Sequence, residues 1–287
     1  MGMQINTNIS ALNSHRNLSN TQNDLSKSLE KLSSGLRINR AADDAAGLSI
    51  SEGLRAQANG LGVAARNAQD GISVIQTAEG ALTEVHSILQ RVRDLAVQAG
   101  SDSNNDDSRK ALTTEATALG EELARIADTT NFNGINLMDG ADLSFQVGAN
   151  GDPSSRISVS LTNLADAVST VTTLTAGTAA IAGTSALAID FTDATTAAKS
   201  ITDIDTAITA ISSSRSELGA SQNRFESAIN SLNVSRENLS AAESRIRDVD
   251  MAGEMVKFTA KNILSQAGTA MLAQANQSTQ GVLSLLR

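Results

Sequence analysis

The 287-residue sequence contains no cysteine, tryptophan or tyrosine, and only one proline and two histidines. The absence of cysteine excludes disulfides, thiolate metal sites and cysteine nucleophiles together. His15 and His86 supply too few imidazoles for a typical zinc enzyme. Five phenylalanines are the only aromatic residues and offer little bulk for a compact core, and irregular loops usually need more proline. The composition therefore favours a mainly helical, elongated protein.

The charge balance and the hydropathy exclude two classes of partner. The sequence has 31 acidic and 22 basic side chains and a formal charge of -9, without a basic cluster that could neutralise phosphates. No apolar run approaches the roughly 20 residues that span a bilayer. The amino-terminal sequence also lacks the basic segment followed by an apolar segment that is typical of a signal peptide. We expect neither nucleic acid nor membrane as a partner, and no cleaved signal peptide.

Both ends of the sequence carry thin apolar stripes at helical spacing. The stripe in residues 5–36 includes Ile5, Ile9, Leu12, Leu25, Leu29 and Leu32. The stripe near the carboxyl end includes Ile263, Ala267, Ala270, Val282, Leu285 and Leu286. Each stripe is too narrow to hold a helix in water by itself. We expect the two ends to form an antiparallel helix pair that is ordered only when further copies surround it.

Residues 42–99 contain no proline and carry two apolar seams offset by one residue, which predicts a long helix with two neighbours. A second long helix is predicted from about Ile204, with polar Arg215, Gln222, Arg236 and Glu243 interrupting its apolar spine. The predicted core of this rod is Leu54, Leu61, Ile72, Ile75, Leu82, Leu89, Leu218, Phe225, Leu232, Leu239 and Ile246. Such polar residues weaken a seam while fixing its alignment.

Between these helices the pattern changes. A helical stripe over residues 112–126 is followed by turn sequences, and residues 143–161 alternate as a β-hairpin around Pro153. Residues 163–203 are a Thr/Ala-rich insert with one short strand expected at residues 187–191. We therefore expect an inner pair from residues 1–43 and 254–287, a helical rod with a β-hairpin from residues 44–162 and 204–253, and the insert.

Motifs that could carry chemistry have better structural explanations. Residues 60–65 match G-x-G-x-x-A, but helical periodicity runs through them where dinucleotide binding needs a strand first. Residues 102–113 lack the glycine and the glutamate of a calcium loop. The Asp43–Asp44 and Asp248–Asp250 carboxylates are expected at helix ends or beside arginine. No nucleophile, base, metal set or cofactor site emerges, so we expect a protein that is not an enzyme.

The terminal sequences resemble a known family. "INTNISALNSHRNLS", "LEKLSSGLRINRAADDAAGLSIS" and "DGISVIQTAEGALTEVHSILQRVRDLAVQAG" resemble the amino-terminal region of bacterial flagellins, and "LGASQNRFESAINSL", "NLSAAESRIRDVDMA" and "NILSQAGTAMLAQANQSTQGVLSLLR" resemble the carboxy-terminal region. The resemblance implies a structural subunit that polymerises into the extracellular flagellar filament for motility. It also implies type III export without signal cleavage, a chaperone on the carboxy-terminal segment, and contacts with hook-filament junction and cap proteins.

The same resemblance implies recognition by vertebrate immune receptors. The residues that match the Toll-like receptor motif are Arg91, Leu95 and Glu115, and "VLSLLR" at residues 282–287 matches the segment sensed by NAIP-class receptors. The large outer domains of long flagellins are absent here, so a thin, smooth filament is expected. The alternative is a cytoplasmic signalling rod of the chemoreceptor type, which would have one turn at its midpoint and sustained heptads on both sides.

Overall fold

The computed structural model describes residues 8–164, 191 and 193–285, and helices dominate them. The helices are α1 (Ile9–Ser34), α2 (Ala45–Ala99), α3 (Asp106–Thr129), α5 (Ala194–Arg247) and α6 (Met251–Leu285). The expected mainly helical fold with a small β region is confirmed. The chain divides into two compact units, unit 1 from residues 1–58 and 237–287 and unit 2 from residues 59–236.

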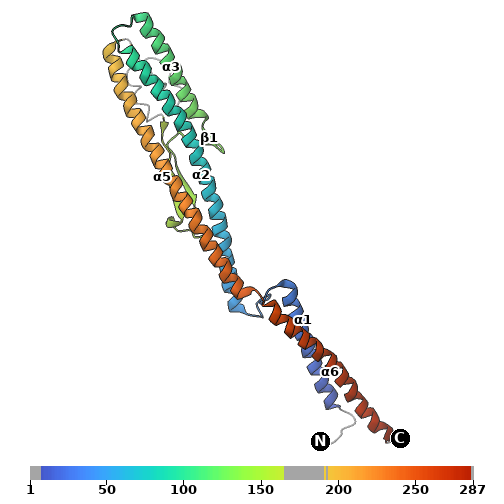
Figure 1. Cartoon of the computed structure of the whole chain (residues 1–287). Helices are drawn as coiled ribbons and strands as arrows, with labels where there is room; N and C mark the ends of the chain where they lie inside the picture. Colours follow the sequence, from blue (N-terminus) through green and yellow to red (C-terminus); the bar gives the residue numbers. More distant parts are fainter. Residues whose placement is uncertain (1–7, 165–190, 192, 286–287) are drawn as a thin grey trace. The chain divides into compact units, whose positions relative to one another are not determined.

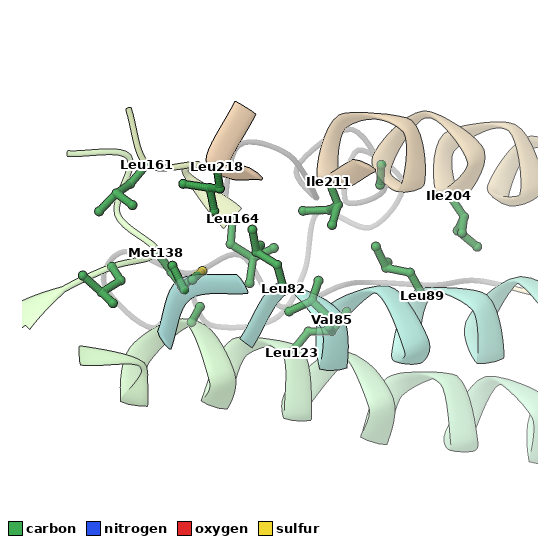
Figure 2. Packing of buried hydrophobic residues seen from close by; sticks show 14 of the residues in the cluster. Leu82, Val85, Leu89, Leu123, Met138, Leu161, Leu164, Ile204, Ile211 and Leu218 are labelled. Atoms are coloured by element: carbon green, nitrogen blue, oxygen red, sulfur yellow. The ribbon is translucent and has the colours of Figure 1, made fainter. Parts of the chain in front are cut away.

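Unit 2 is a long helical bundle in which α2 lies beside both α3 and α5 (Figure 1). Its core combines buried side chains of all three helices. In Figure 2, Leu89 of α2 lies beside Ile204 of α5, while Val85 of α2 lies beside Leu123 of α3. The two offset seams of the sequence thus correspond to two helical neighbours.

Two antiparallel strand pairs follow α3 in unit 2. The strands β1 (Asn131–Phe132) and β2 (Ile135–Asn136) are joined by Asn133 and Gly134, whose φ angles of 51° and 80° are those of a tight hairpin turn. The strands β3 (Asp142–Gln146) and β4 (Arg156–Ser160) pair within the segment predicted as a hairpin. A short 3-10 helix, Pro153–Ser155, precedes β4.

The hairpin β3–β4 is anchored to both long helices. Phe145 of β3 meets Phe225 of α5 edge to face, with ring centroids 5.5 Å apart. A Cβ at Gly71 of α2 would lie 3.0 Å from the Phe225 ring and 3.3 Å from the Phe145 ring, so glycine leaves the space that the rings need. Asn67 of α2 donates through Nδ2 to the Gln146 carbonyl oxygen at 3.1 Å.

Helix α5 begins at Ala194, ten residues before the start predicted from Ile204. The earlier turns were missed because their core positions carry small residues of the low-complexity segment. Ala197 and Ser200 are buried and continue the 3 and 4 spacing that leads to Ile204, Ala207 and Ile211. Residues 187–190 of the short strand expected in the insert lie outside the described residues, and Phe191 is not in a strand.

Candidate assembly surface on the terminal helices

Unit 1 is built on the antiparallel pair of α1 and α6 (Figure 1). Asn8 caps α1 by accepting from the Ala11 amide, and its Nδ2 donates to the Ala275 carbonyl oxygen at 2.9 Å. Farther along the pair, Lys261 Nζ lies 2.7 Å from Asp24 Oδ2. Residue numbers rise along α1 as their partners fall along α6, which fixes the antiparallel direction.

Both pairs of carboxylates that the sequence places at helix ends act locally. Asp44 Oδ1 accepts from the Gly47 amide at the start of α2, and Asp250 Oδ1 accepts from the Ala252 and Gly253 amides at the start of α6. Asp43 Oδ2 accepts from the Asn39 and Arg40 amides, and the Arg40 amide is the main cause of the lowered pKa of Asp43. These contacts are N-cap and turn contacts, which stabilise the helix starts.

The seam between α1 and α6 is half polar. Its buried or half-buried positions on α1 are Ala11, Ser14, Leu18, Thr21, Leu25, Ser28 and Leu32. The corresponding positions on α6 include Glu254, Phe258, Lys261, Ser265, Gly268, Leu272 and Ala275. Both sets recur at intervals of 3 and 4, as in a coiled coil. Because few of these side chains are large and apolar, the seam supplies little hydrophobic stabilisation.

A buried polar pair lies within this seam. Ser28 Oγ donates to Glu254 Oε1 at 2.7 Å, and both residues are buried. Lys257 Nζ lies 3.1 Å from Glu254 Oε2. The Ser28 hydrogen bond, opposed by desolvation and assisted by Lys257, lowers the pKa of Glu254. A paired carboxylate at this position fixes the alignment of the two helices while contributing little to their attraction.

Exposed large apolar side chains gather in unit 1, chiefly on α6. Ten of the 14 large hydrophobic residues that are exposed among the described residues belong to unit 1. They are Ile9, Leu12, Leu29, Ile50, Met251, Met255, Val256, Ile263, Leu264 and Met271. Ile9 is 60% exposed and Ile263 is 61% exposed. Monomeric proteins rarely leave contiguous apolar patches uncovered, and such patches mark interaction sites.

One stripe of α6 shows the arrangement most clearly. Val256, Ala260, Ile263, Ala267 and Ala270 are all exposed and share one face of the helix. This face lies two residues, or about 200° around the axis, from seam positions such as Glu254, Lys261, Ser265 and Gly268. The stripe therefore points away from α1. We call it the outer stripe.

Units 1 and 2 differ sharply in burial. Among the described residues, Ile38 is the one hydrophobic residue of unit 1 that is buried, whereas most of the buried hydrophobic residues of unit 2 form one core. Leu36 to Ile38 lie beside the end of α5, where the Arg37 amide donates to the Arg247 carbonyl oxygen at 2.6 Å. Unit 1 thus depends on caps, backbone contacts and a polar seam more than on a core of its own.

The predicted terminal stripes divide between the seam and the outer faces. Leu25 and Leu32 lie in the seam, while Ile9, Leu12 and Leu29 are exposed. Ile263, Ala267 and Ala270, predicted as packing or assembly residues, all lie in the outer stripe and face away from α1. The α6 side of the seam was not predicted, because glutamate, lysine and serine are polar and do not indicate buried positions in a sequence. Ile5, Leu286 and the side chains of Val282 and Leu285 lie outside the described residues.

The predicted rod residues fall into two burial classes. Ile75, Leu82, Leu89, Leu218, Phe225 and Leu232 are buried in unit 2. Half-buried positions are Leu61 and Ile72 in unit 2, and Leu54, Leu239 and Ile246 in unit 1. Of the polar residues in the α5 spine, Arg215 approaches Glu79 at 3.8 Å, and Arg236 lies against Gly62.

Arg91 and Glu115, for which the resemblance predicts receptor recognition, meet on the surface of unit 2. Arg91 Nη2 and Nε lie 2.6 and 3.1 Å from Glu115 Oε1, and both side chains are about half exposed. Leu95 is instead buried in the hydrophobic core of unit 2. The ion pair therefore forms an exposed polar feature that joins α2 to α3, and the Leu95 side chain is not accessible from outside in this subunit.

The dismissed motifs have structural partners. Gly60 and Gly62 lie inside α2, where Gly60 approaches Ala149 of the hairpin connection. Asp102 lies 3.6 Å from Arg109, and no group of three or more metal-type side chains occurs among the described residues. His86 Nε2 lies 3.0 Å from Gln90 Nε2 within α2. Within the described part of the chain, no helix is both long and apolar enough to cross a membrane.

Family comparisons account for this architecture. The model of the bacterial flagellin N-terminal helical region matches residues 5–142, and that of the C-terminal helical region matches residues 201–286. The chain belongs to the bacterial flagellin family. This flagellin is 54% identical to a flagellin of Halalkalibacterium halodurans over 99% of this chain and 100% of the relative. It is 46% identical, with the same coverage, to a flagellar filament 33 kDa core protein of Treponema phagedenis.

A solved structure described as a flagellar hook-associated protein of Vibrio parahaemolyticus shares the fold. Its TM-score is 0.58 at 13% identity, covering 72% of this flagellin and 100% of that chain. The relatives give no support to the chemoreceptor-type alternative.

Proposed function

We propose that this chain is the structural subunit that polymerises into the filament of a bacterial flagellum. The observation that carries the proposal is the apolar outer surface of α6, together with exposed Ile9, Leu12 and Leu29 of α1, beside a half-polar seam. The family membership and the relative named as a filament core protein support the same assignment.

The occupant that best fits the outer faces is a second copy of the same chain. Each copy exposes large apolar side chains on both terminal helices, so a subunit covered on one side still offers exposed apolar residues to the next copy. Contacts between different patches that do not close into a ring generate an open helical polymer. Small residues in the outer stripe, such as Ala260, Ala267 and Ala270, allow helices of neighbouring copies to approach closely.

The finer parts of the assignment extend this proposal. The inner layer would come from residues 1–43 and 254–287, and the rod with its hairpin from residues 44–162 and 204–253. Export through the flagellar type III apparatus would leave the subunit outside the cell, with a chaperone covering the carboxy-terminal segment beforehand. Junction and cap proteins would contact the ends of the filament. A Toll-like receptor would bind the surface that carries Arg91 and Glu115. NAIP-class receptors would recognise residues 282–287.

Seeded polymerisation of the purified chain tests the assignment. Filaments of constant width in electron micrographs, growing above a critical concentration, are expected. The Ile263→Asp variant places a charge in the outer stripe, whereas Ile263→Leu keeps the position apolar. The Asp variant should lose sedimentable filaments while retaining its helicity, and the Leu variant should lose far fewer. Equal polymerisation of both variants would show that the outer stripe is not an assembly contact.

A further inference from the structure

Methionine is distributed unevenly between the two units. Of the four methionines among the described residues, Met138 is 3% exposed in the core of unit 2. Met251, Met255 and Met271 of α6 are 47%, 49% and 64% exposed. Thioethers are soft and flexible, and exposed ones are oxidised more readily than buried ones.

Met255 and Met271 flank the outer stripe on opposite sides, and Met271 lies two turns beyond exposed Leu264. Met251 lies one helical turn before Met255, at the start of α6. All three are exposed, whereas seam positions such as Glu254 and Gly268 are buried or half-buried. A change in their polarity therefore acts on the exposed surface of α6.

We propose that Met251, Met255 and Met271 are oxidation sites through which a peroxide blocks assembly of the subunit; this inference rests on the proposed polymerisation. In the reaction, the methionine sulfur attacks one peroxide oxygen and the O–O bond breaks. A sulfur–oxygen bond forms, sulfur loses two electrons, and the other oxygen takes up a proton and leaves as water. The product, methionine sulfoxide, is polar and can be reduced back by methionine sulfoxide reductases.

The consequence depends on whether the subunit is free or assembled. In the free subunit the three methionines are about half exposed or more, which leaves them open to a small oxidant. In a polymer that covers the outer faces of α6 they are shielded. A sulfoxide formed beforehand would have to be buried as a polar group, forfeiting the burial of an apolar side chain. That loss raises the critical concentration by roughly tenfold for each oxidised methionine that the contact covers.

The experiment uses the full chain with hydrogen peroxide as the oxidant. Free subunits are treated, excess peroxide is removed, each methionine is mapped by peptide mass spectrometry, and seeded polymerisation is measured. We expect Met251, Met255 and Met271 to be oxidised well before Met138, and the critical concentration to rise with them. Treatment of filaments at the same dose should oxidise the three residues more slowly. Retained polymerisation of fully oxidised subunits, or faster oxidation of Met138, would overturn the inference.

A triple variant, M251L/M255L/M271L, identifies the residues responsible. Each protein is compared with its own untreated sample, so a change in starting polymerisation does not enter the result. The amount of polymer formed after oxidation, divided by the amount formed by the untreated sample, should fall in the wild type and stay near one in the triple variant. An equal fall in both would assign the effect to other methionines and contradict the proposal. Restoration of wild-type assembly by sulfoxide reductases is expected, and failure of that restoration counts against it.

The untreated wild-type sample separates the two proposals. If untreated subunits do not extend seeds, the proposed filament function fails. If untreated subunits extend seeds and oxidised ones do so equally, only the redox inference fails. Circular dichroism of the oxidised subunits should show retained helicity, which distinguishes a blocked surface from an unfolded chain.

Discussion

Ser28 of α1 donates its hydroxyl to the buried carboxylate of Glu254 on α6, at 2.7 Å between Oγ and Oε1. This contact joins residues 226 positions apart in the sequence and lies in a seam with little apolar area. It aligns two helices that leave many of their large apolar side chains, such as Ile263 and Met271, exposed. The hydrogen bond thus sets the alignment of α1 with α6. We expect the further stabilisation of the two helices to come from contacts with other copies of the chain.

Ser28→Ala should loosen the α1–α6 pair. The change leaves the buried Glu254 without its closest partner, which costs about 1 to 3 kcal/mol. The expected result is faster hydrogen exchange of amides in α1 and α6 with little change in the thermal unfolding of unit 2. The matched control is Ser26→Ala, because the Ser26 hydroxyl bonds only to the carbonyl oxygen of its own helix. Identical amide hydrogen exchange in the two variants would show that Ser28 does not align α1 with α6.

Acid should weaken the same pair. The pKa of Glu254 is lowered in the folded chain, chiefly by the Ser28 hydrogen bond, so the ionised form is preferentially stabilised there. The stabilisation is present above the unfolded pKa, near 4.5, and is lost as pH falls through the lower folded value. The pKa of Asp24 is also lowered, chiefly by its hydrogen bond with Lys261. Helicity measured against pH should fall over this range in the wild type, and less steeply in Glu254→Gln.

Gly47→Ala should disrupt the start of α2. A Cβ at this position would lie 2.4 Å from Asp44 Oδ2 and 2.8 Å from Ile38 Cδ1, so it strikes both the helix cap and the buried hydrophobic residue of unit 1. Loss of the cap alone costs roughly 1 kcal/mol. Gly53→Ala is the control, since nothing lies within 4 Å of its Cβ position in the same helix. That control should be stabilising by up to about 1 kcal/mol, measured by thermal unfolding.

Phe225→Ala should destabilise unit 2 by about 3 to 5 kcal/mol. The ring is fully buried, meets Phe145 of the hairpin edge to face, and fills the space beside Gly71. Leu239→Ala, at a half-buried position of the same helix, should cost less. Chemical denaturation of both variants checks the order. A smaller loss for Phe225 than for Leu239 would mean that the hairpin is not anchored through this ring.

Periodicity predicted the parts of the fold that rest on large apolar residues. The two seams of α2 and the alternation of β3 and β4 were visible because leucine, isoleucine, valine and phenylalanine mark their inner positions. The first turns of α5 were missed because Ala197 and Ser200 are small, and the seam of α6 was missed because Glu254 and Lys261 are charged. Burial of such residues depends on tertiary contacts that a single sequence does not display.

The assembly surface was only partly predictable for a related reason. A stripe such as Ile263, Ala267 and Ala270 has the same spacing whether it faces a helix of its own chain or a neighbouring copy. The structure separates the two cases because the contacts between Ser28 and Glu254 and between Asp24 and Lys261 fix the rotation of α6. The apolar stripe is then left facing outward.

Hydrogen exchange of α1 and α6, measured in dilute subunits and in seeded filaments, tests the central claim most directly. The claim is that the outer faces of these helices are covered only by further copies of the chain. The amides of α1 and α6 should exchange rapidly in the dilute subunit and become strongly protected in the filament, while those of the unit 2 core stay protected in both. Equal protection of α1 and α6 in the two states would contradict it.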